Sequence, residues 1–166
     1  RAQGEGDFAR ERVGGRGVGV MESTQTEHRG TEAQRPTEED LLLGAAFARS
    51  KKVIGCVIEV HRVLGPGLLE SAYEQALCHE LSLQGIEFRK QVDLPVVYKG
   101  HVLPHYYRLD VVVEEALLLE LKAVEILLPL HKAQTLTYLR MSGLKTALLI
   151  NFNVEVVRQG IRRISL

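Results

Sequence analysis

The scarcity of cysteine and the absence of a long apolar run exclude several classes of protein. Of the 166 residues, two are cysteines, Cys56 and Cys78, and they form no Cys-x-x-Cys pair. Both sit among apolar residues, which predicts buried free thiols in a reducing cytosol. No apolar run approaches the length needed to span a bilayer, and the first residues show no signal-peptide pattern. We therefore expect a cytoplasmic protein that makes no membrane contact.

Net charge is also lacking, because 21 Lys and Arg balance 21 Asp and Glu. The charges are unevenly placed, since residues 1–40 hold 6 basic and 9 acidic residues while residues 41–166 hold 15 and 12. The larger part is therefore mildly basic, which permits nucleic-acid binding without requiring it. So weak a charge predicts either a small substrate footprint or a partner that supplies affinity, such as a second copy in a homodimer or an accessory protein.

Residues 1–40 are rich in Gly, Arg, Glu and Thr and lack apolar periodicity. This composition predicts a disordered N-terminal tail. Because Met21 is followed by a similar polar stretch, residues 1–20 are either an extension upstream of the natural start or a genuine tail. The chain as a whole is 45% apolar and 25% charged, ordinary values for a soluble protein, and we expect one domain over residues 41–166.

Apolar spacing predicts a mixture of helices and strands in that domain. Val53, Val57 and Val60 recur at helical spacing, and the Gly-Pro-Gly turn at 65–67 then ends the helix. Residues 161–166 either extend the sheet or form a short terminal element. We expect helices over 41–64, 67–83 and 130–141, and strands over 94–98, 106–113, 117–124, 146–152 and 154–157.

The hairpin predicted around residues 114–116 carries Asp110, Glu120 and Lys122 among apolar residues. Side chains alternate across a strand, so Glu120 and Lys122 share one face. A turn centred on Glu115 pairs Asp110 with Glu120 and brings all three charges together, whereas a two-residue turn places Asp110 on the opposite face. Buried carboxylates repel each other unless they pair or hold a cation. The first register therefore predicts a metal site, and a salt-bridged strand pair at the sheet rim is the ordinary alternative.

Two helical pairs add polar groups to this picture. Glu70 lies in the first turn of the second helix, where the helix dipole favours an anion, and Tyr73 shares its face. Gln134 and Tyr138 are four residues apart on the third helix and also share a face. Each pair has an ordinary alternative, namely a helix-start acid with a core tyrosine, and a polar pair on a helix surface. A zinc site built from Cys56, His61, Cys78 and His79 is disfavoured by the poor spacing of these ligands. His61 is better explained as a helix-end or core histidine beside the Gly-Pro-Gly turn.

Six short segments follow one another along residues 51–166. They are Glu-Val-His at 59–61, Gly-Pro-Gly-Leu-Leu-Glu-Ser-Ala-Tyr at 65–73, Tyr-Arg-Leu-Asp at 107–110, Glu-Leu-Lys-Ala-Val-Glu at 120–125, His-Lys-Ala-Gln-Thr-Leu-Thr-Tyr-Leu at 131–139 and Leu-Ile-Asn-Phe-Asn at 149–153. Together they resemble the GxxExxY protein family, a branch of the PD-(D/E)XK nuclease superfamily. One departure is that Leu109, and not Pro, precedes Asp110.

The resemblance implies an α/β fold with a restriction-endonuclease-like core over residues 41–166. Such a core has a mixed central β-sheet of about four or five strands flanked by α-helices, here with two N-terminal helices. It also implies phosphodiester hydrolysis in a nucleic acid, for which we expect DNA. The alternative is a catalytically silent module that binds nucleic acid or protein and keeps the nuclease fold.

The resemblance further implies a role for each polar residue. Asp110, Glu120, the backbone carbonyl of Leu121 and Glu70 would hold Mg²⁺ or Mn²⁺, for which oxygen ligands are suited. Lys122 would orient the attacking water or stabilise the charged transition state. Two further residues would contact the substrate: Gln134 to position it, and Tyr138 to touch a base or phosphate.

Overall fold

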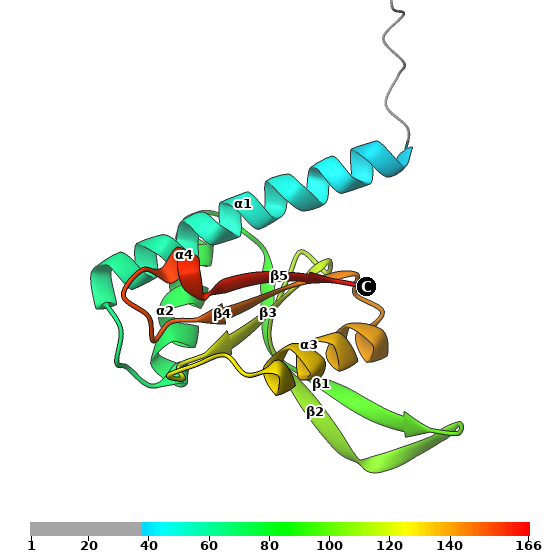
Figure 1. Ribbon diagram of the computed structural model, residues 1–166. Coiled ribbons are helices and arrows are strands. Elements are labelled where there is room, and N and C mark those ends of the chain that lie inside the picture. The colour runs from blue at the N-terminus through cyan, green and yellow to red at the C-terminus, as the bar shows by residue number, and fades with distance from the viewer. Residues whose placement is uncertain (1–37) are drawn as a thin grey trace, which may run out of the picture. The chain divides into compact units, whose positions relative to one another are not determined.

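The computed structural model describes residues 38–166. The tail predicted for residues 1–40 lies outside the described residues except for its last three, which begin the first helix. The described chain folds into a mixed α/β structure around one five-stranded sheet (Figure 1). The elements in chain order are α1 (Glu38–Leu64), α2 (Glu70–Leu83), β1 (Phe88–Tyr98), β2 (His101–Val113), β3 (Leu117–Lys122), α3 (Pro129–Ser142), β4 (Thr146–Asn151), α4 (Val157–Gly160) and β5 (Ile161–Ser165).

The sheet has the strand order β1-β2-β3-β4-β5, so neighbours in the sequence are neighbours in space. All pairs are antiparallel except β3 with β4, which are parallel and joined through α3. The central strands β3 and β4 are buried on both faces, as expected for apolar strands covered by helices. The predicted α/β fold with a mixed sheet of four or five strands and two N-terminal helices is confirmed.

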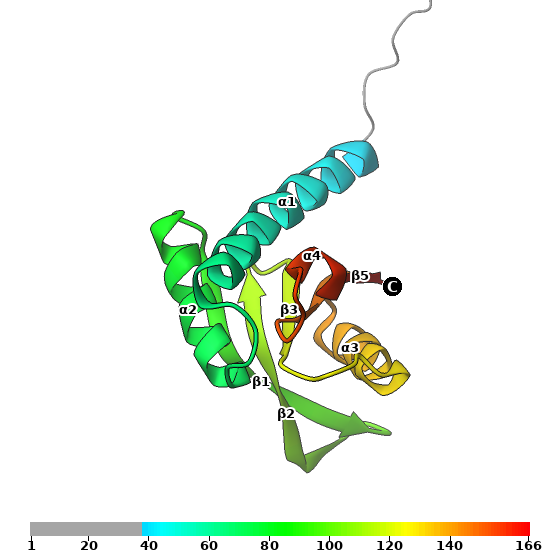
Figure 2. The same cartoon turned by 60° about the vertical axis from the view of Figure 1, so that its left-hand side comes forward.

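Helices cover both faces of this sheet (Figure 2). On one face α1 and α2 pack against the sheet, with Val57 and Leu77 in one buried cluster with Val111 and Leu119. On the other face α3 contributes Tyr138 and Leu139 to a second cluster, which includes the following strand residues: Leu109, Val112, Leu118 and Leu149. Within residues 38–166 we find no helix with the length and apolar character needed to cross a bilayer.

The turn between α1 and α2 is fixed by a buried tyrosine. Gly65 and Gly67 have φ angles of 66° and 98°, which explains why glycine stands at these two positions. The Tyr73 hydroxyl donates a hydrogen bond to the Gly65 carbonyl at 2.6 Å and accepts one from the Leu68 N–H at 3.1 Å. The Tyr73 ring stacks on Phe152 with centroids 4.4 Å apart. The start of α2 is thereby tied to the end of β4.

The predicted register of the β2–β3 hairpin is confirmed. Val111 pairs with Leu119 and Val113 with Leu117, which centres the turn on Glu115. Glu114 and Glu115 have φ angles of 48° and 50°. Ion pairs to arginines of α1 and β1 hold the two turn carboxylates: Arg49 with Glu114, and Arg89 with Glu115.

Three of the predicted strands differ from those in the structure. β1 and β2 are much longer than the expected strands 94–98 and 106–113, and their far ends form a two-stranded ribbon that runs past α3 (Figure 1). The strand expected over 154–157 does not form, whereas residues Ile161–Ser165 do pair with β4. The reason is a tight reversal after β4, where a Cβ on Gly160 would lie 2.2 Å from the Asn151 carbonyl oxygen. The Val154 carbonyl contacts Nε2 of His61 at 2.8 Å instead of a neighbouring strand.

Candidate active site

The central strand β3 carries two charged side chains into the α3 side of the sheet. Glu120 and Lys122 alternate with buried residues and lie on the same face as Leu118, which belongs to the cluster under α3. Nζ of Lys122 donates to Oε1 of Glu120 at 2.6 Å, and the two side chains are only 15% and 3% exposed. Oε2 of Glu120 is also buried, and no group in the described part of the chain donates a hydrogen bond to it. The strand thus holds a buried carboxylate with one oxygen paired and the other without a partner.

Asp110 joins these residues where β2 separates from β3. The β2–β3 pairs run only as far as Val111 with Leu119, while β3 continues along β4 to the end of the strand. In place of the next backbone bond, the Leu121 N–H donates to Oδ2 of Asp110 at 2.8 Å. Because the N–H and C=O of a strand residue point to the same side, the Leu121 carbonyl faces this gap as well. The gap between β2 and β3, which we call the fork, therefore gathers the Asp110 carboxylate and a backbone carbonyl beside Glu120.

The fork changes which face β2 presents. Val111 and Val113 contact the α1–α2 cluster, and Val112 contacts the α3 cluster, as alternation requires. Beyond Asp110 the pattern shifts, since Leu109 joins the α3 cluster. Asp110 is therefore the point at which the strand rotates, and its side chain lies between the two strands.

Burial and mutual repulsion perturb the carboxylates at the fork. Burial, followed by the negative charge of Glu120, raises the pKa of Asp110 from 3.8 to about 7. Burial also raises the pKa of Glu120, although the hydrogen bond from Lys122 opposes that rise. Burial alone would lower the pKa of Lys122, but the hydrogen bond to Glu120 and the surrounding negative charges raise it. The site therefore keeps Lys122 charged and disfavours the ionised form of Asp110. Perturbed pKa values of this kind are common among catalytic carboxylates.

Glu70 lies at the edge of this group, at the first residue of α2. Its negative charge is among the causes that raise the pKa values of Asp110, Glu120 and Lys122, after burial and the closer partners. The Tyr73–Phe152 stack holds this helix start beside β4. The expected functional acid thus lies near the fork.

Gln134 and Tyr138 of α3 form the wall of a pocket next to Lys122. Nε2 of Gln134 donates to the Tyr138 hydroxyl at 2.7 Å, and the Tyr138 ring lies 5.3 Å from that of Tyr107 on β2. Burial and the charge of Glu120 raise the pKa of Tyr138, whose side chain lines the same pocket as Lys122. The pocket has a volume of about 540 Å³, and its lining joins α3 to β2 and β3: Tyr107, Lys122, Leu130, His131, Ala133, Gln134, Thr137 and Tyr138.

Residues at the end of β4 hold the end of β3 and the segment after it through hydrogen bonds. The Phe152 N–H donates to the Lys122 carbonyl at 2.8 Å. The buried Asn151 side chain accepts from the Val124 N–H at 3.0 Å and donates to the Val124 carbonyl at 2.7 Å. The segment that follows Lys122 is therefore held in place, which positions the site without help from a bound ligand.

The donor set fits a hard divalent cation, although it is sparse. Within residues 38–166 no three His, Cys, Asp or Glu side chains come close enough to form a metal cluster. The fork does provide a backbone carbonyl and two carboxylates, one of which is Glu120 with its unpartnered Oε2. Oxygen donors with room for water ligands are the usual environment of Mg²⁺ and Mn²⁺. The residues considered for a zinc site have other environments. Both cysteines are buried and free, and Nε2 of His61 contacts the Val154 carbonyl.

A comparison with protein families covers most of the described chain. The model of the PD-(D/E)XK nuclease superfamily matches residues 48–164 of the chain. The chain belongs to the PD-(D/E)XK nuclease superfamily. No curated protein and no solved structure matches it. Asp110, Leu109 in the place where Pro is expected, and the Glu120-Leu121-Lys122 segment all lie within the matched residues. Membership of this superfamily supports a nuclease-type, hydrolytic function.

Three residues near the fork were missed by sequence reasoning. Tyr107 belongs to the Tyr-Arg-Leu-Asp segment, but its contact with Tyr138 depends on the rotation of β2 at the fork. Nδ1 of His131 accepts from the Leu128 N–H at 3.1 Å and so caps the start of α3, which its place three residues after Leu128 would have allowed us to infer. No local sequence pattern predicts that the Asn151 side chain bonds to the backbone of Val124.

Proposed function

We propose that this chain is a divalent-metal-dependent nuclease of the GxxExxY branch that hydrolyses phosphodiester bonds in DNA. The observation that carries the proposal is the buried, unpartnered Oε2 of Glu120 beside the Asp110 carboxylate. Two carboxylates buried together are costly unless a cation neutralises them. A purely structural strand pair has no need of this arrangement.

Four residues would hold Mg²⁺ or Mn²⁺: Asp110, Glu120, Leu121 through its carbonyl, and Glu70 at longer range through a bound water. Such an ion lowers the pKa of a bound water and polarises the phosphate when it is present. The chain's own contribution is to fix the carboxylates in place before the ion arrives. The Leu121 N–H holds Asp110, and Lys122 holds Glu120.

Lys122 is the residue that acts on the reacting groups. Its side chain is 15% exposed and lines the pocket, and its ammonium stays charged because negative groups surround it. A cation in a largely buried site stabilises developing negative charge on a phosphate more strongly than it would in water. Gln134 and Tyr138, which share the pocket, would then hold the nucleotide next to the cleaved bond.

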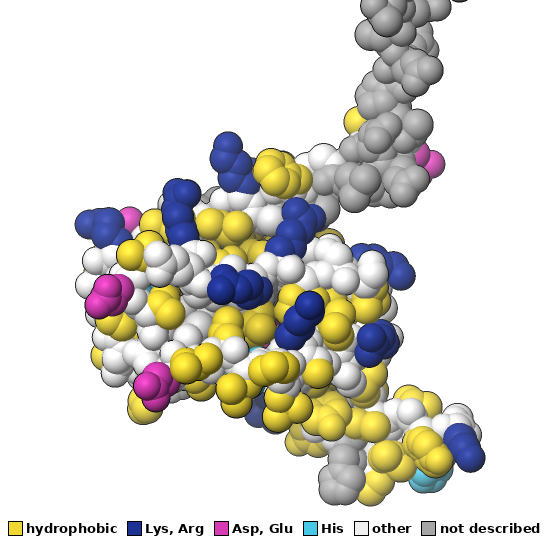
Figure 3. Space-filling model, in the orientation of Figure 1, with side chains coloured by type: hydrophobic (Ala, Val, Ile, Leu, Met, Phe, Trp, Pro, Cys, Tyr) yellow, Lys and Arg dark blue, Asp and Glu magenta, His cyan; other side chains and the backbone are white. Residues whose placement is uncertain are grey.

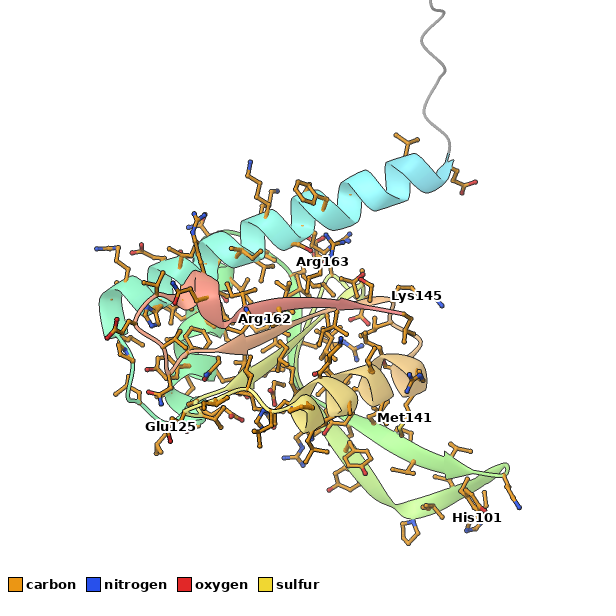
Figure 4. The ribbon with its side chains drawn as sticks, viewed as in Figure 1. His101, Glu125, Met141, Lys145, Arg162 and Arg163 are labelled. Atoms are coloured by element: carbon orange, nitrogen blue, oxygen red, sulfur yellow. The ribbon has the colours of Figure 1, made fainter. Side chains whose placement is uncertain are left out.

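The distribution of charge supports a nucleic-acid substrate. Lys and Arg side chains spread over the side formed by α1, β5 and α3, where acidic side chains are few (Figure 3). Residues 126–166 contain one acid, Glu155, against several basic residues, among them Arg162 and Arg163 on β5 and Lys145 before β4 (Figure 4). Arg162, Arg163 and Lys132 line a hollow beside the first turn of α3, the turn that also borders the Lys122 pocket. Phosphates bound there would run toward the fork.

The silent-module alternative rests on one observation, the short ion pair between Lys122 and Glu120. A lysine with a purely structural role would form the same ion pair with Glu120. The two functions separate when the protein is incubated with single-stranded and duplex DNA and RNA in the presence of Mn²⁺. We expect metal-dependent cleavage of DNA that is lost in Asp110→Ala and kept in Asp93→Ala, a matched change at an exposed aspartate of β1. Absence of cleavage of every nucleic acid by the folded wild-type protein would favour the silent module.

A further inference from the structure

The far ends of β1 and β2 form a ribbon that leaves the body of the sheet. We call residues 95–108 the arm. It extends beyond α3 in two views, and His101 marks its tip (Figures 1, 2 and 4). Its large side chains are bare, with Tyr98 60%, Tyr106 59% and Tyr107 46% exposed. Tyr106 and Tyr107 are consecutive in a strand and so point to opposite faces. Both faces of the arm therefore carry exposed rings.

Folding alone does not explain these residues. A two-stranded hairpin is at best marginally stable when nothing packs on it. Val97 and Val102, which pair near the tip, are 58% and 59% exposed, so the apolar residues there are not packed against the described part of the chain. Exposed apolar surface of this kind marks an interaction site. The question is which partner its chemistry fits.

The composition of the arm fits nucleic acid. Between Leu94 and Arg108 there is no Asp, Glu, Asn or Gln. Lys99 places its ammonium 5.5 Å from the centre of the Tyr98 ring, and the Arg108 guanidinium, which also forms an exposed ion pair with Asp93, lies 5.9 Å from that of Tyr106. Rings on which bases stack, accompanied by cations for the phosphates, are the combination that binds single strands. The amides and carboxylates that read base edges in a duplex groove are missing.

The arm is also connected to the candidate active site. The Tyr107 ring at its base contacts Tyr138, which accepts a hydrogen bond from Gln134. These three residues line the same pocket as Lys122. A nucleic-acid strand whose bases stack along the arm would therefore enter the pocket at the fork.

We infer that the arm is a stacking platform for unpaired nucleotides, and that the substrate is a single-stranded or unwound nucleic acid. This inference rests on the proposed nuclease function for the site and adds the substrate class. Stacking on the arm needs a free base face. Paired bases inside a duplex offer none, so the arm discriminates against intact duplex.

Binding without turnover tests the arm directly. The full chain carrying Asp110→Asn is titrated against a fluorescent oligothymidylate of about 20 nucleotides and against a blunt duplex, with anisotropy as the readout. We expect tighter binding of the single strand. Tyr98→Ala with Tyr106→Ala should weaken that binding at least roughly tenfold, because two rings on which bases stack are lost. Tyr98→Phe with Tyr106→Phe is the matched control and should stay within about twofold, because the rings remain.

A substrate too small to reach the arm separates chemistry from binding. In the otherwise wild-type chain, the two alanine changes should leave Mn²⁺-dependent hydrolysis of bis(p-nitrophenyl) phosphate unchanged and raise KM for single-stranded DNA. Equal binding of duplex and single strand, or no loss in the alanine variant, would overturn the inference. So would sedimentation showing a dimer that the alanine changes convert to a monomer, because the arm would then be a surface for self-association. If the wild-type chain hydrolyses neither substrate, the nuclease proposal fails while the anisotropy result still decides the role of the arm.

Discussion

Removing the charge of Asp110 should stabilise the metal-free protein at neutral and higher pH. The folded chain raises the pKa of this carboxyl from 3.8 to about 7, mainly through burial and then through the charge of Glu120. The folded state therefore binds the proton more tightly than the unfolded chain does. Stability should fall as the pH rises from about 4 to about 7, and should then stay level.

The size of the effect follows from that shift. Each pKa unit corresponds to about 1.4 kcal/mol, so a rise of roughly three units sets an upper bound of about 4 kcal/mol. Partial solvent contact and relaxation reduce this, and we expect Asp110→Asn to gain about 1–2 kcal/mol at about pH 8. Asparagine keeps a side-chain oxygen that can accept the hydrogen bond of the Leu121 N–H, so the local geometry is retained.

Urea unfolding in EDTA at about pH 5 and about pH 8 measures the gain, which should be larger at the higher pH. Asp93→Asn is the control, because Asp93 lies on β1 with its side chain 63% exposed in an ion pair with Arg108. The control should leave the midpoint unchanged at both pH values. If Asp110→Asn unfolds at the same urea concentration as wild type, or a lower one, at about pH 8, then the fork does not destabilise an ionised carboxylate. The argument for a cation site would lose its basis.

Other substitutions probe the remaining parts of the structure. Lys122→Met should abolish cleavage and slightly tighten Mn²⁺ binding, because it removes a cation next to the ion site. Calorimetric Mn²⁺ titration and a cleavage assay measure the two effects. Loss of the fold together with metal binding would show that Lys122 forms a structural ion pair instead. Gly160→Ala should lower the free energy of unfolding by about 1–3 kcal/mol, because its Cβ would lie 2.2 Å from a carbonyl oxygen. Gly55→Ala, in open space on α1, should raise it by up to about 1 kcal/mol. Melting temperatures equal to that of the wild type would contradict both predictions. Tyr73→Phe should cost about 1–3 kcal/mol in urea unfolding, because it leaves the two hydrogen-bonding groups of the Gly-Pro-Gly turn without their partner; an unchanged midpoint would show that water replaces the hydroxyl.

Much of the fold could be predicted from local patterns. Helix α1 ends at the predicted residue, Leu64, because glycines with positive φ follow it. Side-chain parity narrowed the β2–β3 hairpin to two registers, and the structure shows the one whose turn is centred on Glu115. The strand expected over 154–157 was wrong because valines favour strands, while the close approach of Gly160 to Asn151 is a tertiary contact.

The candidate site was less predictable than the strands that carry it. The identities of Asp110, Glu120 and Lys122 could be read from sequence, whereas the rotation of β2 at Asp110 depends on how three strands twist together. The full length of β1 and β2 was missed for a related reason. A ribbon with exposed faces lacks a regular alternation of apolar and polar residues, so no strand was predicted over residues 88–93 and 101–105.

The bond from the Leu121 N–H to Asp110 gives the protein a built-in reporter. Most amides in a central strand donate to a neighbouring backbone carbonyl, whose charge never changes. The Leu121 amide donates to a titrating side chain, so its proton resonance should move whenever the charge of Asp110 changes. A single cross-peak in a heteronuclear NMR spectrum would then follow protonation of the site, and the same peak would respond to a bound cation. The state of the fork could be read in solution without any substrate.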